Sequence, residues 1–177
     1  MRKHCKDLHV IKDPIRLGIE LAVESVLEQA LERHFGWSEF RPGQRPVVEA
    51  LLAGQDCLAV LPTGGGKSLC YQLPALVRQG LVLVISPLVA LMQDQVRQLE
   101  RRGIPAACMH GGLSTPERRQ LLQRLRDNRL RLLYLAPERL QAEATRQLLD
   151  DVLASGRLVA LAVDEAHCIS AWGHDFR

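Results

Sequence analysis

Short, wholly apolar runs alternate along this chain with longer stretches of helical periodicity, and that alternation limits the fold more than any other feature. Residues 81–85 read Leu-Val-Leu-Val-Ile, and residues 158–163 contain no polar side chain. A run that is apolar at every position predicts a strand buried on both faces, as in parallel sheets covered by helices on either side. The sequence therefore predicts an α/β sandwich of three layers around a mostly parallel sheet of about five strands.

Periodicity and helix-ending residues locate the expected elements. Leucines at helical spacing precede Gly36, which is expected to end the first helix, and Ser114 and Glu117 have the spacing of a capping box. The expected strands cover 57–61, 81–85, 106–109, 130–135 and 158–163, and the expected helices cover 16–34, 42–53, 67–78, 88–102, a segment from 114 onward, and 143–154. We expect residues 1–30 to be an N-terminal helical extension of unknown role and 31–177 to form one domain.

Composition and charge suit a globular domain and argue against a strongly basic nucleic-acid binder. Hydrophobic residues make up 47% of the chain, and 23 basic against 20 acidic side chains give a formal net charge of only +3. This balance suits a globular domain with a core and is not that of a strongly basic nucleic-acid binder. The five cysteines form no C-x-x-C pair, so we expect buried or incidental thiols. The basic start is followed by no clean apolar run, which favours the cytoplasm, or the nucleoid in a bacterium.

Six arginines between positions 118 and 131 form a basic stretch that allows two interpretations. The stretch could be a patch that binds DNA. Glu117 and Asp127 are interspersed with the arginines, however, which favours a solvated helix face.

A glycine-rich segment, Pro-Thr-Gly-Gly-Gly-Lys-Ser at 62–68, stands between an expected strand and an expected helix. Glycines let backbone N–H groups approach phosphate oxygens, and the N-terminus of the helix adds a favourable dipole. Lys67 would reach the β- and γ-phosphates, and the Ser68 hydroxyl would bind Mg²⁺. The strict phosphate-loop pattern has glycine at position 61, where this chain has Leu61, so a flexible glycine turn is the alternative. The residues expected to cradle the nucleotide phosphates are Thr63, Gly64, Gly65, Gly66, Lys67 and Ser68.

The run 158–163 ends at Asp-Glu-Ala-His, residues 164–167. A phosphate loop needs a carboxylate that holds Mg²⁺ at the end of a neighbouring strand, and Asp164 has that position. Glu165 would orient or deprotonate the attacking water, and His167 would couple the site to the segment after it. The alternative is a charged strand end.

Taken in order, these motifs resemble those of superfamily 2 helicases, and their flanks resemble the RecQ family. The resemblance covers residues 31–177 and rests on the segments 35–44, 62–75, 86–95, 134–140 and 164–177. It implies a RecA-like P-loop NTPase fold and an ATP- and Mg²⁺-dependent DNA helicase that unwinds in the 3′-to-5′ direction during DNA repair and recombination.

The same resemblance implies roles for individual residues. Gln44 would read the adenine edge, between Trp37 and Arg41 stacked on the ring. Ser86 and Arg139 would contact the backbone of single-stranded DNA. Stacking on an aromatic-rich loop would sense that DNA, through Trp172, His174 and Phe176. The alternatives are a core or hinge aromatic for Trp37, a helix-surface charge for Arg139 and an ordinary aromatic turn for the loop.

The chain ends at Arg177, inside that loop. In the family, a second RecA-like domain supplies an arginine to the γ-phosphate and helps to grip DNA. We therefore expect this polypeptide to be the N-terminal ATP-binding lobe, unable to unwind DNA alone. The alternatives are a remnant that binds nucleotide or single-stranded DNA without turnover, and a nucleotide-dependent scaffold.

Overall fold

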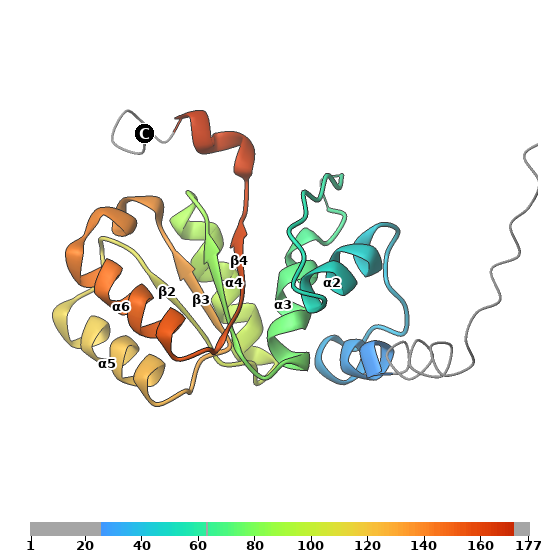
Figure 1. Cartoon of the computed structure of the whole chain (residues 1–177), viewed down its shortest axis with the longest axis horizontal. Coiled ribbons are helices and arrows are strands. Elements are labelled where there is room, and N and C mark those ends of the chain that lie inside the picture. Colours follow the sequence, from blue (N-terminus) through green and yellow to red (C-terminus); the bar gives the residue numbers. More distant parts are fainter. Residues whose placement is uncertain (1–25, 63, 172–177) are drawn as a thin grey trace, which may run out of the picture.

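The structure is a computed structural model that describes residues 26–62 and 64–171. Its centre is a parallel sheet of four strands in the order β2-β3-β1-β4 (Figure 1). The strands are β1 (Leu81–Ile85), β2 (Ala106–Met109), β3 (Leu132–Leu135) and β4 (Leu158–Val163).

Helices cover both faces of the sheet and complete a three-layer sandwich (Figure 1). Residues 26–35 are helical. The other helices are α2 (Gln44–Leu52), α3 (Lys67–Val77), α4 (Val89–Arg101), α5 (Thr115–Arg126) and α6 (Glu143–Ala154), with short 3-10 helices at Pro137–Gln141 and Ala166–Ala171. The predicted α/β sandwich is therefore confirmed.

Alternation along the strands divides the core into two clusters. Val82 and Val84 of β1 pack on the side of the residue 26–35 helix, α2, α3 and α4, whereas Leu81 and Leu83 pack on the side of α5 and α6. Successive side chains of a strand point to opposite faces, so a strand buried on both faces must be apolar at every position. This is why an uninterrupted apolar run identified β1.

Two predicted helix boundaries are confirmed. Gly36 has φ +72° and its N–H bonds to the Glu32 carbonyl, which ends the first helix. The capping box also forms: the Ser114 backbone N–H donates to Glu117 Oε2 at 2.8 Å. Hydrogen bonds from the Ser114 hydroxyl and backbone lower the pKa of the Glu117 carboxyl.

The first helix crosses the predicted domain boundary at residues 30 and 31. Leu27 and Leu31 lie one turn apart on either side of it, and both belong to the core. The boundary itself stays a prediction, and residues 1–25, which hold the first part of the predicted helix, lie outside the described residues.

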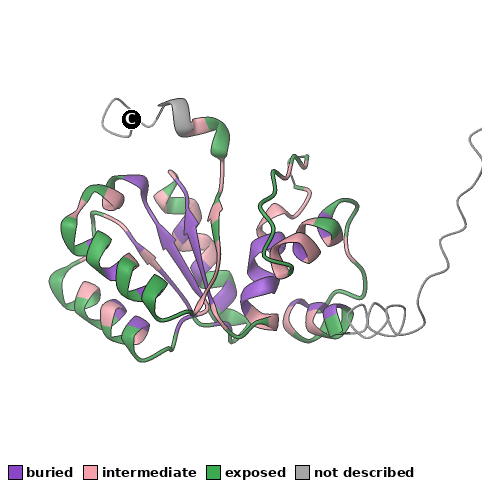
Figure 2. Ribbon diagram, viewed as in Figure 1, coloured by how far each residue is buried: buried purple, intermediate pink, exposed green. Residues whose placement is uncertain are grey.

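The predicted strand over 57–61 is wrong. This segment forms no ladder with the described residues, so the described sheet has four strands, and Leu58 and Val60 are each 86% exposed (Figure 2). β4 is consequently an edge strand, and its Leu161 and Val163 are exposed as well. Apolar composition is not sufficient for a strand, because a strand also requires a neighbour that takes up its backbone hydrogen bonds.

A leucine-to-alanine substitution in β3 and another in residues 57–61 test whether only the first segment belongs to the core. Leu133→Ala on β3 removes a side chain with no exposed surface and should lower the free energy of unfolding by about 2–5 kcal/mol. Leu58→Ala should change it by no more than about 0.5 kcal/mol, because Leu58 makes few contacts to lose. Urea denaturation followed by circular dichroism measures both. Equal losses would mean that residues 57–61 are part of the core.

Candidate nucleotide site

The candidate site lies at the edge where the parallel strands end. The Asp164 N–H donates to the Ile85 carbonyl at 2.9 Å, so the residues after β4 and β1 emerge side by side. Lys67, at the start of α3, lines a cleft of about 460 Å³ together with Asp164 and Glu165. The structure thus brings together the lysine and the two carboxylates that the sequence singled out.

Two glycines give the loop before α3 its shape. Gly64 and Gly66 both have φ +76°, a left-handed conformation that side chains with a Cβ seldom adopt. A Cβ on Gly66 would also overlap the Gln44 amide nitrogen. Gly66 is the N-cap of α3 and no side chain caps that end, so the first N–H groups of the helix are available to an anion.

Gln44 fixes this loop from α2. Its side chain is fully buried; Oε1 accepts from the Arg41 N–H at 2.8 Å, and Nε2 donates to the carbonyls of Gly65 and Gly66 at 3.1 and 3.0 Å. Arg41 adds a bond from Nη1 to the Gly64 carbonyl at 2.6 Å. We call this set of contacts the loop clamp. Reading of adenine by Gln44 stays a prediction, and it requires the amide to exchange these partners.

Aromatic and guanidinium groups cluster beside the loop. Trp37 stacks on Phe35 with ring centroids 5.7 Å apart, and the Arg41 guanidinium carbon lies 5.8 Å from the Trp37 centroid. Arg102 lies 5.9 Å from the same ring and donates to the Phe35 carbonyl at 2.8 Å. The Trp37–Arg41 pair was expected from sequence. Arg102 was not, because it comes from the end of α4 and belongs to no motif.

Asp164 is held by two hydrogen bonds. Its Oδ1 accepts from the Glu165 N–H at 3.0 Å, and its Oδ2 accepts from the Tyr71 hydroxyl at 3.3 Å. Burial raises the pKa of Tyr71 well above its usual value, and the charge of Asp164 raises it further, so the phenol stays protonated and donates. Sequence reasoning gave Tyr71 no role, although helical spacing from Lys67 puts it on the same face of α3.

Glu165 has an unusual backbone. Its φ is +52°, a strained value for a residue with a side chain and one that tends to occur at functional positions. Its Oε2 lies 3.2 Å from His167 Nδ1, with the imidazole largely exposed. The two residues expected to handle water and to couple the site are therefore in contact.

A buried polar cluster lies behind the cleft. Gln72 Nε2 donates to the Tyr134 hydroxyl at 3.1 Å and to Gln95 Oε1 at 3.0 Å, which ties α3 to β3 and α4. Burial raises the pKa of Tyr134 to about 12. Burial likewise raises the pKa of the Cys70 thiol, on the cleft wall, to about 11, so this cysteine is a poor nucleophile.

Two residues predicted to contact DNA, Ser86 and Arg139, have buried polar atoms without hydrogen-bond partners among the described residues. Ser86 follows β1 at the same edge but is 1% exposed, and its hydroxyl has no hydrogen-bond partner among the described residues. Arg139 lies in the 3-10 helix Pro137–Gln141, and its buried Nε likewise has no partner within the described part of the chain. Their DNA contacts stay predictions. The other expected site residues, Thr63, Trp172, His174 and Phe176, lie outside the described residues.

The donor chemistry fits a nucleotide with Mg²⁺. An amine, a hydroxyl and a carboxylate come from Lys67, Ser68 and Asp164, and hydroxyl and carboxylate oxygens suit this hard cation. Within residues 26–62 and 64–171, no group of three or more His, Cys, Asp or Glu side chains could hold a metal ion. Mg²⁺ would thus depend on phosphate oxygens and water for its remaining ligands, as is usual for this ion.

Comparison with known proteins decides the family. The model of the DEAD/DEAH box helicase family matches residues 41–177. The chain belongs to this family. A solved structure titled as a hypothetical ATP-dependent RNA helicase from Sulfolobus tokodaii matches 86% of this chain and 56% of its own, with a TM-score of 0.56 at 18% identity, which supports the helicase-type fold alone.

Curated relatives confirm the resemblance to RecQ. This DEAD/DEAH box chain is 52% identical over 157 residues to an ATP-dependent DNA helicase RecQ from Synechocystis, and 47% identical over 147 residues to one from Haemophilus influenzae. It is 47% identical over 152 residues to a probable ATP-dependent DNA helicase RecS from Bacillus subtilis. The matches cover 83–89% of this chain but only 23–32% of those relatives. No helix among the described residues is long and apolar enough to span a membrane.

Removing the Gln44 side chain tests the loop clamp. Gln44→Ala should lower the free energy of unfolding by about 1–3 kcal/mol, because it leaves the Arg41 N–H without its partner. Exchange of the Arg41 amide hydrogen, followed by NMR, should accelerate. Gln123→Ala is the matched control, since the side chain of this exposed glutamine bonds to Asp127 alone among the described residues. If both variants behave alike and Arg41 stays protected, Gln44 does not hold the loop.

Proposed function

We propose that this chain is the ATP-binding lobe of a RecQ-type DNA helicase. The loop clamp carries the proposal. It holds a glycine loop at the open N-terminus of α3, while Lys67 and Asp164 line one cleft. Similarity to proteins named ATP-dependent DNA helicases supports the identity of both nucleotide and substrate.

Each group of the cleft has a proposed task. Backbone N–H groups of the loop and Lys67 bind the β- and γ-phosphates. Ser68 and Asp164 hold Mg²⁺, which when bound neutralises charge on the phosphate oxygens. Tyr71 keeps the Asp164 carboxylate oriented through its hydroxyl hydrogen bond. Glu165 positions the attacking water. His167, whose Nδ1 lies 3.2 Å from Glu165 Oε2, couples the site to the segment after it.

The adenine would lie beside the aromatic cluster. Trp37 is 37% exposed and so offers a ring face, with Arg41 on that ring. Gln44 is adjacent through its bond to the Arg41 N–H. Exchange of the Gln44 amide from loop carbonyls to the adenine edge would couple base recognition to the position of the phosphate loop.

The proposed substrate is single-stranded or partly duplex DNA, unwound in the 3′-to-5′ direction in repair and recombination, in the cytoplasm or on the nucleoid. Arg139 and Ser86 would contact the backbone, and Trp172, His174 and Phe176 would stack on bases. A second RecA-like domain would supply an arginine to the transition state, an effect of about 10³–10⁵ in rate for comparable enzymes. The chain spans 32% and 23% of the length of the two RecQ relatives.

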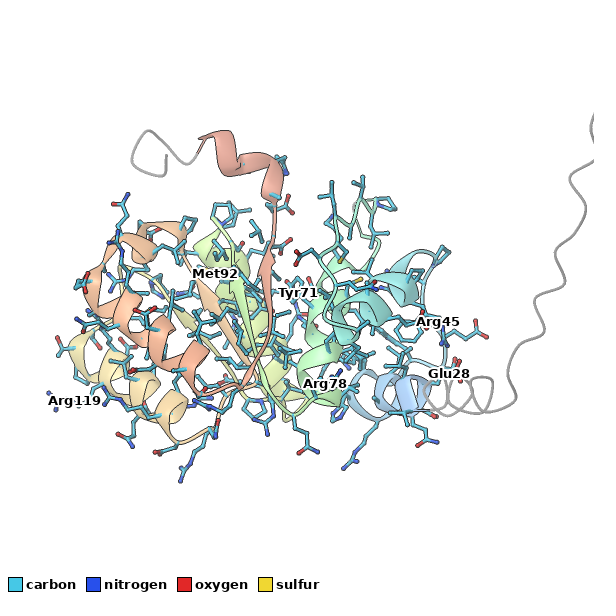
Figure 3. The ribbon with its side chains drawn as sticks, in the orientation of Figure 1. Glu28, Arg45, Tyr71, Arg78, Met92 and Arg119 are labelled. Atoms are coloured by element: carbon cyan, nitrogen blue, oxygen red, sulfur yellow. The ribbon has the colours of Figure 1, made fainter. Side chains whose placement is uncertain are left out.

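Nucleotide binding tests the cleft. Lys67→Ala should weaken binding of a fluorescent ATP analogue about 10- to 100-fold, because hydrogen bonds to charged groups contribute about 1.5–3 kcal/mol. Asp164→Asn should abolish the gain in affinity that Mg²⁺ gives. Arg119→Ala, on the outer face of α5, should leave both unchanged (Figure 3). Equal affinity in the wild type and Lys67→Ala would contradict the proposed phosphate site.

An assay of ATP hydrolysis distinguishes a lobe that needs a second RecA-like domain from an enzyme that is active alone. The isolated chain should bind ATP yet release phosphate no faster than background, with or without single-stranded DNA. Turnover that DNA stimulates and that disappears in Lys67→Ala would show that no second domain is required. Restored turnover when a RecQ second domain is added would exclude a remnant that only binds.

A further inference from the structure

A second concave site lies at the edge of the sheet opposite the candidate nucleotide site. This cleft, of about 440 Å³, precedes the strands: Pro105 leads into β2 and Arg131 into β3. Because all strands are parallel, their starts share one edge and Asp164 lies at the other. The residues of interest on its wall come from three distant segments, and they are Arg33, His34, Gly103, Asn128, Arg129 and Arg131.

The cleft is basic, and among the described residues no acidic side chain lines it. Arg33 has no hydrogen bond or ion pair with the described residues, and Arg129 has one weak, exposed ion pair, 3.9 Å from Asp127. Arg131 is half-buried and donates to the carbonyls of Asn128 and Leu130 at 3.3 and 3.4 Å. Three arginines thus line one cleft with one weak ion pair among the described residues, in a chain whose net charge is only +3.

The backbone holds these arginines in place. The Arg131 N–H donates to the Pro105 carbonyl at 2.8 Å, and the Arg129 N–H donates to the Arg124 carbonyl at 2.9 Å. Asn128 lies in the turn that leads from α5 to Arg129 and has φ +63°, a conformation that asparagine tolerates better than most residues. Burial and the neighbouring Arg33 charge lower the pKa of His34, so the imidazole adds little charge at neutral pH.

Part of the positive charge of these arginines balances the ends of helices. Residues 26–35, α4 and α5 all end near this cleft, and each helix C-terminus carries about −0.5 charge, which cations stabilise. Three such ends amount to about −1.5, and the Asp127 carboxylate beside Arg129 adds about −1, so a surplus of about +0.5 remains from the three positive side chains. The helix ends account for half of the arginine charge at most.

We propose that this cleft binds adjacent phosphate groups of a polyanion. Guanidinium forks suit phosphate oxygens, and an open cleft accepts a chain that continues beyond it. The two sources of such phosphates are the backbone of a nucleic acid and a free polyphosphate. The site is separate from the DNA contacts proposed at the opposite edge, and it requires no nucleotide.

Two arginines of the same basic stretch that do not line the cleft provide the control. Arg119 is exposed on α5 (Figure 3), and Arg118 beside it is half-buried. Arg124 is not suitable, because it donates to the Ala106 carbonyl at 3.1 Å and pairs with Glu100. The double variants Arg33→Gln/Arg129→Gln and Arg118→Gln/Arg119→Gln therefore remove the same charge from the cleft and from the helix face.

Fluorescence anisotropy measures how tightly the wild type and the two double variants bind labelled duplex and single-stranded oligonucleotides. The full chain is used without nucleotide, over a series of salt concentrations. The cleft double variant should bind duplex at least about tenfold more weakly at low salt, and its slope of log affinity against log salt should shrink by about 2. The helix-face variant should keep most of the wild-type slope. Equal losses in both variants, or no loss in either, would overturn the proposal.

Inorganic tripolyphosphate distinguishes the sources. If it displaces the oligonucleotide from the wild type at micromolar concentration and does not bind the cleft variant, a free polyphosphate is the ligand. If it fails to compete while the cleft variant loses the oligonucleotide, the backbone is the ligand. Arg131→Lys should keep more affinity than Arg131→Gln, and thermal unfolding of each variant identifies loss of folding. ATP-analogue affinity, unchanged in the cleft variant, separates this result from the proposed nucleotide site.

Discussion

The pairing of β1 with both β3 and β4 organises the molecule. Ile85 is in register with Leu135 on one side and Val163 on the other, so Ser86, Ala136 and Asp164 leave the sheet at one edge. Burial of β1 on both faces makes a slip of this register costly, because a shift of one residue would exchange the side chains between the two halves of the core. The position of the Asp164 carboxylate is therefore a consequence of core packing.

The glycine loop is positioned in a different way. A phosphate loop is usually anchored by the strand before it, but residues 57–61 pair with nothing in the described sheet. The loop is held instead by the clamp from Gln44 and Arg41, and α3 packs on β1 and β4. The Tyr71–Asp164 hydrogen bond is then the direct polar link between the helix after the loop and the strand that carries the carboxylate. Lys67 and Asp164 thus line one cleft whose walls are fixed by separate sets of contacts.

Apolar runs and motif order predicted most of the fold because each reports a local property. A strand such as β1, apolar at every position and fully buried, is identified by its own residues. Residues 57–61 have a similar composition, but pairing depends on a neighbour elsewhere in the chain, which composition does not reveal. Lys67, Asp164 and Glu165 were expected together because parallel strands share an edge. The position of Tyr71 beside Lys67 could have been predicted from helical spacing. The loop-clamp contacts of Gln44, in contrast, depend on three-dimensional packing.

The cleft that Arg33 shares with Arg129 and Arg131 also could not be predicted from the sequence, because the first of these arginines is distant from the others along the chain. The two edges of the sheet would attract phosphate in different ways. At the ends of the strands, phosphate would meet the N–H groups of α3 and a single lysine, so affinity there depends on the exact shape of the glycine loop. At the starts of the strands, helices end and their dipoles oppose an anion, so any attraction must come from guanidinium charge. Charge of that kind is screened by salt, whereas a backbone cradle depends on shape and remains effective. The two edges of one sheet are therefore suited to different anions: a small nucleotide held by shape, and an extended polyanion held by charge.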